Sequence, residues 1–379
     1  MNKPAMCNNN LLDKEFISFL KPLHIICSFL LLPKISFSGD KVYSINRKYI
    51  IYYIIGISIT YGLLISTLTS IVEFYEDIAI FYVYITAYSQ YSINYTLVCI
   101  FNFFHSDVYV KLLLKLQAIE INLYDCKDTK KMRILVRFTC FLLLAIYILF
   151  VTLKLIYDPL WDWVRGAFIF TALIFDIELS YCICVAYFLV CKVERWCKIM
   201  AIDPKKITLQ DEVGLIFMET MCKVYEDILD ALEFLKKTSQ FTILLHFVIV
   251  FVQSITYIEI LILMTQNRNI EPGSVKSHAY GVTLWISKAV VTESTLCLVC
   301  EILYRRIASA QTVVISYTCN YNSQRARRFL KNIRRLNRVK FRRINVCGIF
   351  TVDAALPLRL GRLIADYTVI LLQFAFLKN

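Results

Sequence analysis

The sequence has none of the short motifs that mark common catalytic or nucleotide-binding sites. It contains no Walker loop, no dinucleotide-binding fingerprint and no nucleophile elbow. No nucleophile, base and metal ligands cluster along it, and His246 has no second histidine or cysteine at a ligand spacing. We therefore expect no enzyme activity, no cofactor and no metal site.

Charge is missing from long stretches of the chain. Residues 49–72 and 78–104 contain no Asp, Glu, Lys or Arg. About 20 apolar residues cross the roughly 30 Å core of a bilayer, so each stretch is long enough to span it. Apolar residues make up 58% of the 379 residues and the mean hydropathy is +0.58, more than a soluble core requires. A soluble globular protein is therefore excluded.

The hydropathy pattern predicts an all-α membrane protein with seven transmembrane helices. Lys154 is expected to snorkel to the interface and, with Tyr157, to lengthen a short third span. Ionisable residues inside later spans are costly in lipid, so we expect them to face the protein interior. The expected spans are residues 49–72, 78–104, 138–157, 166–191, 238–264, 278–300 and 350–377. Together they form one seven-span transmembrane domain over residues 49–379.

The N-terminal segment, residues 1–48, precedes these spans. Its apolar run, Leu23 to Leu32, is too short to cross a bilayer and follows several charged residues. We expect this run to form an interfacial or re-entrant helix, with an uncleaved weak signal sequence as the alternative.

The positive charge of +13 is unevenly distributed. Residues 1–48, 105–137, 192–237 and 305–343 hold 34 of the 42 lysines and arginines. Cationic loops resist translocation, so these segments and the N-terminus are predicted to be cytoplasmic and the C-terminus extracellular. The segments on the other side contain no cysteine, which argues against a disulfide framework. Membrane topology also explains the basic clusters without nucleic-acid binding.

This orientation argues against a G-protein-coupled receptor, whose N-terminus is outside and whose tail is cytoplasmic. The sequence also has no Asp-Arg-Tyr triplet after the third expected span and no Asn-Pro-x-x-Tyr near the end of the seventh. We therefore expect no G-protein partner.

Two cytoplasmic segments have helical periodicity. One has an apolar stripe at 3,4 spacing and predicts an inner extension of the fifth span, either packed on its own neighbours or assembling subunits. Residues 325–343 predict a basic amphipathic helix at the inner membrane surface, attracted by anionic lipid. The stripe consists of Met218, Met221, Tyr225, Ile228, Leu232 and Leu235.

The C-terminal residues 366–374 read Asp-Tyr-Thr-Val-Ile-Leu-Leu-Gln-Phe. This segment resembles the insect gustatory receptor signature of Thr-Tyr, five apolar residues and Gln-Phe, with Asp366 in place of the first Thr and a polar Thr368 in the apolar stretch. Residues 350–358 are similar to the lead-in of moth and butterfly members, and residues 20–33 are similar to the opening of the family.

The resemblance implies a ligand-gated, nonselective cation channel that detects a small tastant in the plasma membrane of gustatory sensory neurons. It implies a homotetramer, or a heteromer with other gustatory receptors, with no G protein required. We expect the ligand to be a bitter plant secondary compound; a fructose-type sugar receptor and a secondary transporter are the alternatives.

In that family the last helix lines the pore. The resemblance therefore places Gln373 and Phe374 at the gate, with Tyr367 and Asp366 as further candidates for the pore wall. Asp366 would favour cations in a pore, or it could simply pair with Arg362 one turn away. Gln373 could equally hydrogen-bond to a neighbouring helix.

Aromatic and polar residues in the spans suggest a pocket for an amphipathic molecule. The alternative is tight interhelical packing with satisfied hydroxyl groups. The candidate pocket residues, expected in the outer halves of spans two to six, are Tyr84, Tyr88, Trp161, Asp176, Gln253, Tyr257, Glu259 and Trp285.

Overall fold

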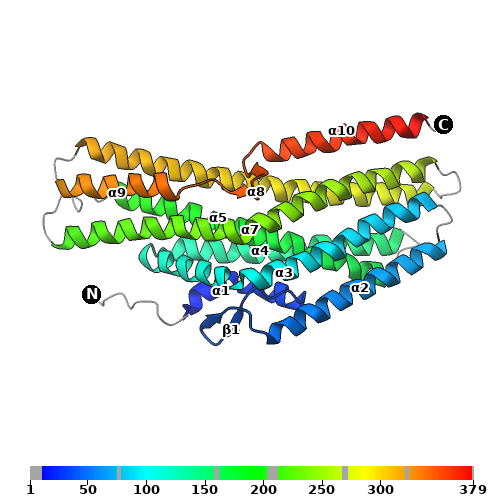
Figure 1. The fold of residues 1–379 in the computed structure, drawn as a ribbon, viewed down its shortest axis with the longest axis horizontal. Coiled ribbons are helices and arrows are strands. Elements are labelled where there is room, and N and C mark those ends of the chain that lie inside the picture. Colours follow the sequence, from blue (N-terminus) through cyan, green and yellow to red (C-terminus); the bar gives the residue numbers. More distant parts are fainter. Residues whose placement is uncertain are drawn as a thin grey trace.

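The computed structural model describes residues 11–74, 78–157, 162–202, 212–266, 272–320 and 324–377. Long helices run roughly along one axis and form an elongated bundle (Figure 1). Each of the three segments expected outside the cell, residues 73–77, 157–165 and 265–277, includes some residues beyond the described ranges. The helices are α1 (Lys14–Phe29), α2 (Lys48–Phe74), α3 (Ile78–Asn122), α4 (Cys126–Tyr157), α5 (Trp163–Ile202), α7 (Glu212–Gln266), α8 (Pro272–Asn320), α9 (Gln324–Lys340) and α10 (Leu356–Leu377).

Five described helices, α2, α3, α4, α5 and α7, are long and apolar enough to cross a membrane. Helices α8 and α10 occupy the sixth and seventh expected spans and carry more ionisable residues, including Lys288 and Asp366. The fold is therefore the all-helical membrane architecture that the hydropathy pattern predicts.

Helix α5 lies at the centre of the bundle. In its apolar window 89% of residues are buried, against 28% for α2 and 33% for α4. The outer helices expose large apolar side chains, such as Ile51 and Ile54 on α2 and Phe141 on α4. Bilayer lipid is the solvent that such a surface requires.

Helix α1 packs on the bundle by one face, with Phe19 and Leu23 buried and Phe29 exposed, and the loop after it enters the bundle. The Tyr95 hydroxyl donates to the Leu30 carbonyl over 2.8 Å, and Lys34 forms a 2.6 Å ion pair with Glu178 of α5. Both side chains of the ion pair are about 1% exposed. Gly56 on α2 permits the approach, because a Cβ there would overlap the Tyr95 hydroxyl.

The loop continues into a short antiparallel hairpin, β1 (Ser36–Ser38) and β2 (Lys41–Tyr43). Its turn contains Gly39 with a φ of 62°, a left-handed conformation that glycine adopts without steric cost. The sequence reasoning did not anticipate strands in this segment.

Several helices continue past the predicted spans into a second bundle, formed by segments that the sequence predicts to be cytoplasmic. Helix α7 is unbroken from Glu212 to Gln266, and the predicted stripe from Met218 to Leu235 is buried along it. This confirms the predicted helical extension of the fifth span. Trp196 of α5 packs on Tyr225 of this stripe, with ring centroids 4.9 Å apart.

The prediction that the basic helix lies in the plane of the membrane is wrong. Helix α9 packs beside α7 and α8, along the bundle axis (Figure 1). Its apolar face, with Leu330 and Ile333 fully buried, is covered by protein, so no lipid is needed there. Lys340 contacts Glu226 at 2.8 Å and Asp230 at 2.6 Å; burial lowers its pKa, but these two carboxylates outweigh burial and raise it.

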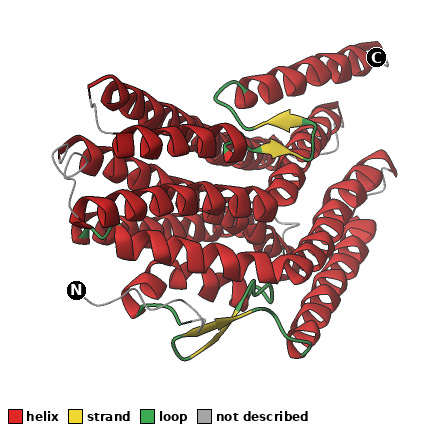
Figure 2. Cartoon of the chain, turned by 60° about the vertical axis from the view of Figure 1, so that its left-hand side comes forward, coloured by secondary structure: helices red, strands yellow, loops and turns green. Residues whose placement is uncertain are grey.

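A second antiparallel hairpin, β3 (Asn345–Val346) and β4 (Phe350–Thr351), connects α9 to α10. Helix α10 therefore begins at Leu356, later than the expected start near Phe350. Asp353 explains the boundary, because its carboxylate accepts from the Ala355 N–H at 3.1 Å and binds Arg359 at 2.6 Å. Figure 2 shows α10 at the edge of the bundle, beyond these strands.

Candidate functional site

Helix α10 is attached to the bundle by one face. Its half-buried residues recur at helical spacing and include Leu360, Ile364, Thr368 and Leu371. Polar contacts with α7 are few: Gln266 donates to the Ala375 carbonyl over 3.1 Å. The remaining surface of α10 has no cover within the described chain.

The candidate pore residues lie on the exposed part of α10. Asp366 and Gln373 are on the face opposite the packed stripe, and Phe374 is 68% exposed. Tyr367 is 46% exposed and touches Phe251 of α7, with ring centroids 5.5 Å apart. Asp366 lies 3.8 Å from Arg362, so the predicted one-turn pairing occurs.

Four candidate pocket residues meet at one small cavity between α3, α4, α5, α7 and α8. These are Tyr84, Tyr88, Tyr257 and Trp285. The cavity volume is about 40 Å³. Pockets for drug-sized ligands usually measure about 300–1,000 Å³, so in this conformation the cavity is too small for such a ligand. The other lining residues are Phe150, Lys154, Arg165, Ile169, His278, Gly281 and Val282.

The other four candidate pocket residues do not line this cavity. Gln253 donates to the Ala87 carbonyl over 2.8 Å and thereby ties α7 to α3. Asp176 is buried deeper in the bundle, and Glu259 is half-buried on α7. Trp161 lies outside the described residues.

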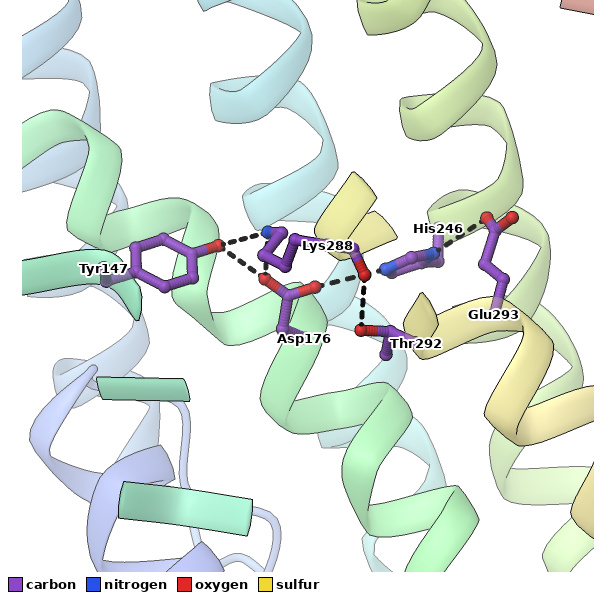
Figure 3. A network of polar contacts seen from close by, with 6 residues as sticks. All are labelled: Tyr147, Asp176, His246, Lys288, Thr292 and Glu293. Carbon is purple, nitrogen blue, oxygen red and sulfur yellow. Dashed lines mark hydrogen bonds and ion pairs between the residues drawn. The ribbon is translucent and has the colours of Figure 1, made fainter. Parts of the chain in front are cut away.

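Next to the cavity, ionisable side chains from three helices form a buried network. Figure 3 shows this network. Asp176 of α5 binds Lys288 of α8 and accepts from the Tyr147 hydroxyl of α4 over 2.6 Å. His246 of α7 lies between Asp176, at 3.5 Å, and Glu293 of α8, at 3.3 Å. These groups face the interior, as expected for charges within spans.

Protonation of His246 would balance the charge of the network. An imidazolium at His246 would donate to both Asp176 and Glu293, so that two cations face two anions. Thr292 is engaged separately, donating to the Lys288 backbone carbonyl over 2.9 Å. Among the described residues no group of three or more His, Cys, Asp or Glu side chains is arranged to hold a metal ion.

Trp285 connects the cavity to the network. One part of its side chain lines the cavity, while the Lys288 ammonium lies 3.7 Å from its ring centroid. The ring also meets Tyr147 edge-on, with centroids 5.6 Å apart. A change in the position of Trp285 would therefore act directly on the charged network.

Three basic lining residues were missed by the sequence reasoning. Lys154, Arg165 and His278 are 5%, 4% and 8% exposed. The expectation that Lys154 snorkels to the interface is wrong: its side chain packs against Gly281, within the bundle. The sequence signal for Lys154 is a single cation at the end of an apolar run. Hydropathy gives such a residue the same value whether its side chain faces lipid or protein.

A larger cavity of about 670 Å³ lies along α4, α5 and α8. Its walls are mostly apolar, and Lys288 is among the lining residues. It includes Leu142 of α4 and Val291 of α8, two of the exposed apolar side chains. The charged network is thus bordered by a small aromatic cavity and a large apolar groove.

Comparison with known proteins shows what this fold is. No protein-family model and no curated protein sequence matches the chain. Among solved structures, the insect olfactory receptor OR5 from Machilis hrabei is similar with a TM-score of 0.65 and 13% identity, covering 95% of this chain and 100% of that chain. The same receptor in complex with eugenol has a TM-score of 0.62 and 12% identity, with the same coverage. The chain therefore has the fold of these insect olfactory receptors.

Proposed function

We propose that the chain is a chemoreceptor of the insect gustatory type: a ligand-gated, nonselective cation channel assembled from several copies in the plasma membrane of sensory neurons. Its fold is that of solved insect olfactory receptors, which belong to the same superfamily of ligand-gated channels. The C-terminal Gln373-Phe374 signature favours the gustatory branch. The proposed N-terminus is cytoplasmic and the proposed C-terminus extracellular, in agreement with the distribution of lysine and arginine.

The polar face of α10 carries the channel proposal. Arg362, Asp366 and Gln373 point away from their own bundle, on a helix that occupies the last span. An ionisable side chain in lipid costs about 2.5–3.5 kcal/mol on insertion scales. A water-filled conduit between copies of α10 removes this cost, and Asp366 would favour cations in it.

The proposed ligand is a small plant compound of the bitter type, bound at the aromatic cavity of Tyr84, Tyr88, Tyr257 and Trp285. The eugenol complex of OR5 supports small-molecule binding by a protein of this fold. Trp285 supplies a route to gating, because it contacts both the cavity and Lys288. Entry of a ligand requires the aromatic walls to move apart, since the cavity volume is about 40 Å³.

The test is electrical recording from cells that express this chain alone, with surface expression verified. We expect cation currents when a panel of plant glycosides, alkaloids, acids and sugars is applied, and a reduced unitary conductance in Asp366→Asn. Stoichiometric uptake without unitary currents would instead indicate a transporter and overturn the proposal. Currents in response to sugars alone would contradict the proposal of a bitter-type ligand but would agree with the proposal of a channel.

A further inference from the structure

Arg165 is a buried cation at the small aromatic cavity. It lies in the first turn of α5, lines the cavity and is 4% exposed. Its Nε and Nη2 atoms have no hydrogen-bond partner among the described residues. A buried guanidinium without partners is strongly unfavourable, so this side chain needs an acceptor in the cavity.

Two further basic residues line the cavity beside Arg165. His278, 8% exposed, also lines the cavity, and its Nε2 has no hydrogen-bond partner in the described part of the chain. Lys154 is a third basic lining residue. None of the lining side chains that the structure describes is acidic.

The carboxylate of Asp162, directly before α5, contacts groups other than the Arg165 guanidinium in the described structure. Asp162 accepts from the Arg165 backbone N–H over 2.7 Å and from the Ser70 hydroxyl over 3.5 Å. Asp162 therefore caps the start of α5 and is not among the residues that line the cavity. The guanidinium of Arg165 is therefore available to a ligand in the cavity.

We infer that this cavity binds an anion: the carboxylate of a small aromatic acid, held by Arg165, with its ring among Tyr84, Tyr88 and Trp285. This inference rests on the proposed function, because it names the ligand class of the same pocket. It narrows the proposed ligand from a plant compound of any charge to a carboxylic acid. Protonated amines are expected to bind poorly.

The geometry suits a carboxylate in particular. A planar guanidinium offers two parallel N–H donors to the two oxygens of a carboxylate, and such charge-assisted bonds are the strong ones. A cavity of about 40 Å³ accommodates a group of a few heavy atoms without rearrangement. The aromatic part of the ligand then lies against the tyrosine and tryptophan rings, where these side chains must give way.

The test is equilibrium binding to the purified full-length protein in lipid nanodiscs, with tryptophan fluorescence as the readout of binding. Benzoate, phenylacetate and trans-cinnamate are each compared with the neutral amide of the same skeleton and with benzylamine as a cation. We expect at least one acid to bind about tenfold or more tightly than its amide, and benzylamine not to bind. If no acid exceeds its amide, Arg165 is merely hydrated and the inference is overturned.

Variants of Arg165 test whether this residue causes the preference for an acid over its amide. Arg165→Gln should bring an acid and its amide to equal affinity, and Arg165→Lys should restore part of the difference. Arg338→Gln, at an exposed site on α9, is the matched control and should leave the preference unchanged. An undiminished acid preference in Arg165→Gln would overturn the assignment. The wild-type comparison of acid and amide holds even if a variant fails to fold.

Binding and conduction are measured separately, so the two proposals fail in different ways. Acid-selective binding without any agonist-evoked current would contradict the channel but keep the anion site. Currents evoked by neutral or cationic compounds, with no acid preference in binding, would keep the channel and overturn the anion site.

Discussion

The Lys288 ammonium is shared between the Asp176 carboxylate and the face of the Trp285 ring, whose centroid is 3.7 Å away. A single cation thus joins α5 to α8 and stands directly behind a wall of the aromatic cavity. Both charged side chains are at most 6% exposed, so the pair is in a medium of low dielectric constant.

Breaking this ion pair should destabilise the fold. Lys288→Met leaves the Asp176 charge buried without its main partner, and loss of one member of a buried pair costs about 3–5 kcal/mol. Thermal unfolding of the purified protein would measure the loss. The double variant Asp176→Asn/Lys288→Met removes both charges and should recover much of it.

The control for this experiment is Lys237→Met. Lys237 pairs with Glu233 at 2.8 Å on the surface of α7, where each side chain is about half exposed, and exposed pairs of this kind contribute about 0.3–0.5 kcal/mol. Equal effects of Lys288→Met and Lys237→Met would contradict a structural role for the buried network.

Gln373 should control permeation. The proposed gate predicts that Gln373→Ala changes unitary conductance or open probability, because the amide would be removed from a constriction formed by several copies of α10. Single-channel recording at matched surface expression tests this. Asn122→Ala, an exposed amide at the end of α3, is the matched control. Unaltered gating and permeation in Gln373→Ala would make the gate assignment wrong.

Gly56 should tolerate no side chain, whereas Gly62 should. A Cβ at Gly56 would overlap the Tyr95 hydroxyl and approach the Leu31 Cβ to 3.1 Å, while a Cβ at Gly62 would meet nothing within 4 Å. We expect Gly56→Ala to cost about 1–3 kcal/mol through overpacking. Gly62→Ala should stay within about 1 kcal/mol of wild type, since both sites are in the interior of α2.

The folded yield and thermal midpoint of both glycine variants distinguish the two sites. Adding Tyr95→Phe to Gly56→Ala gives back the space of the hydroxyl and should recover part of the loss. Indistinguishable midpoints for Gly56→Ala and Gly62→Ala would mean that the loop after α1 does not dock as described.

Gly281→Ala should alter ligand sensitivity without unfolding the protein. The new Cβ would lie 2.9 Å from Cε of Lys154, and this flexible side chain can shift to relieve the contact. The shift moves a lining charge of the cavity, so we expect about a tenfold change in the half-maximal agonist concentration. An unchanged concentration–response curve would argue that the agonist binds elsewhere, for example at the groove of α4, α5 and α8.

Sequence periodicity was sufficient for features that a single helix determines. The long apolar runs predicted the helices, and the Met218 to Leu235 stripe predicted a face that is buried along α7. Tyr84 and Tyr88 are four residues apart, so their presence on one face followed from helical geometry, and the structure brings both to the cavity.

Sequence periodicity could not predict features that depend on how two helices pack against each other. Hydropathy treats Lys154 as a charge at the edge of a span, but its position beside Gly281 depends on how α4 packs on α8. Arg165 directly precedes the expected span of residues 166–191, although it is in the first turn of α5 and 4% exposed. The later start of α10 also depends on a local contact, between Asp353 and Arg359, that competes with helix extension.

Helix α7 is one unbroken element of 55 residues, which at 1.5 Å per residue makes a rod of about 80 Å. Tyr257 at the cavity, His246 in the charged network and Met221 in the buried stripe at the other end of the helix all belong to it. A small tilt of one end must therefore displace the other end in proportion to the distance from its pivot. In the proposed channel, a movement at the cavity would therefore be transmitted along α7 to the bundle at its other end, with no need for a relay of loops between them.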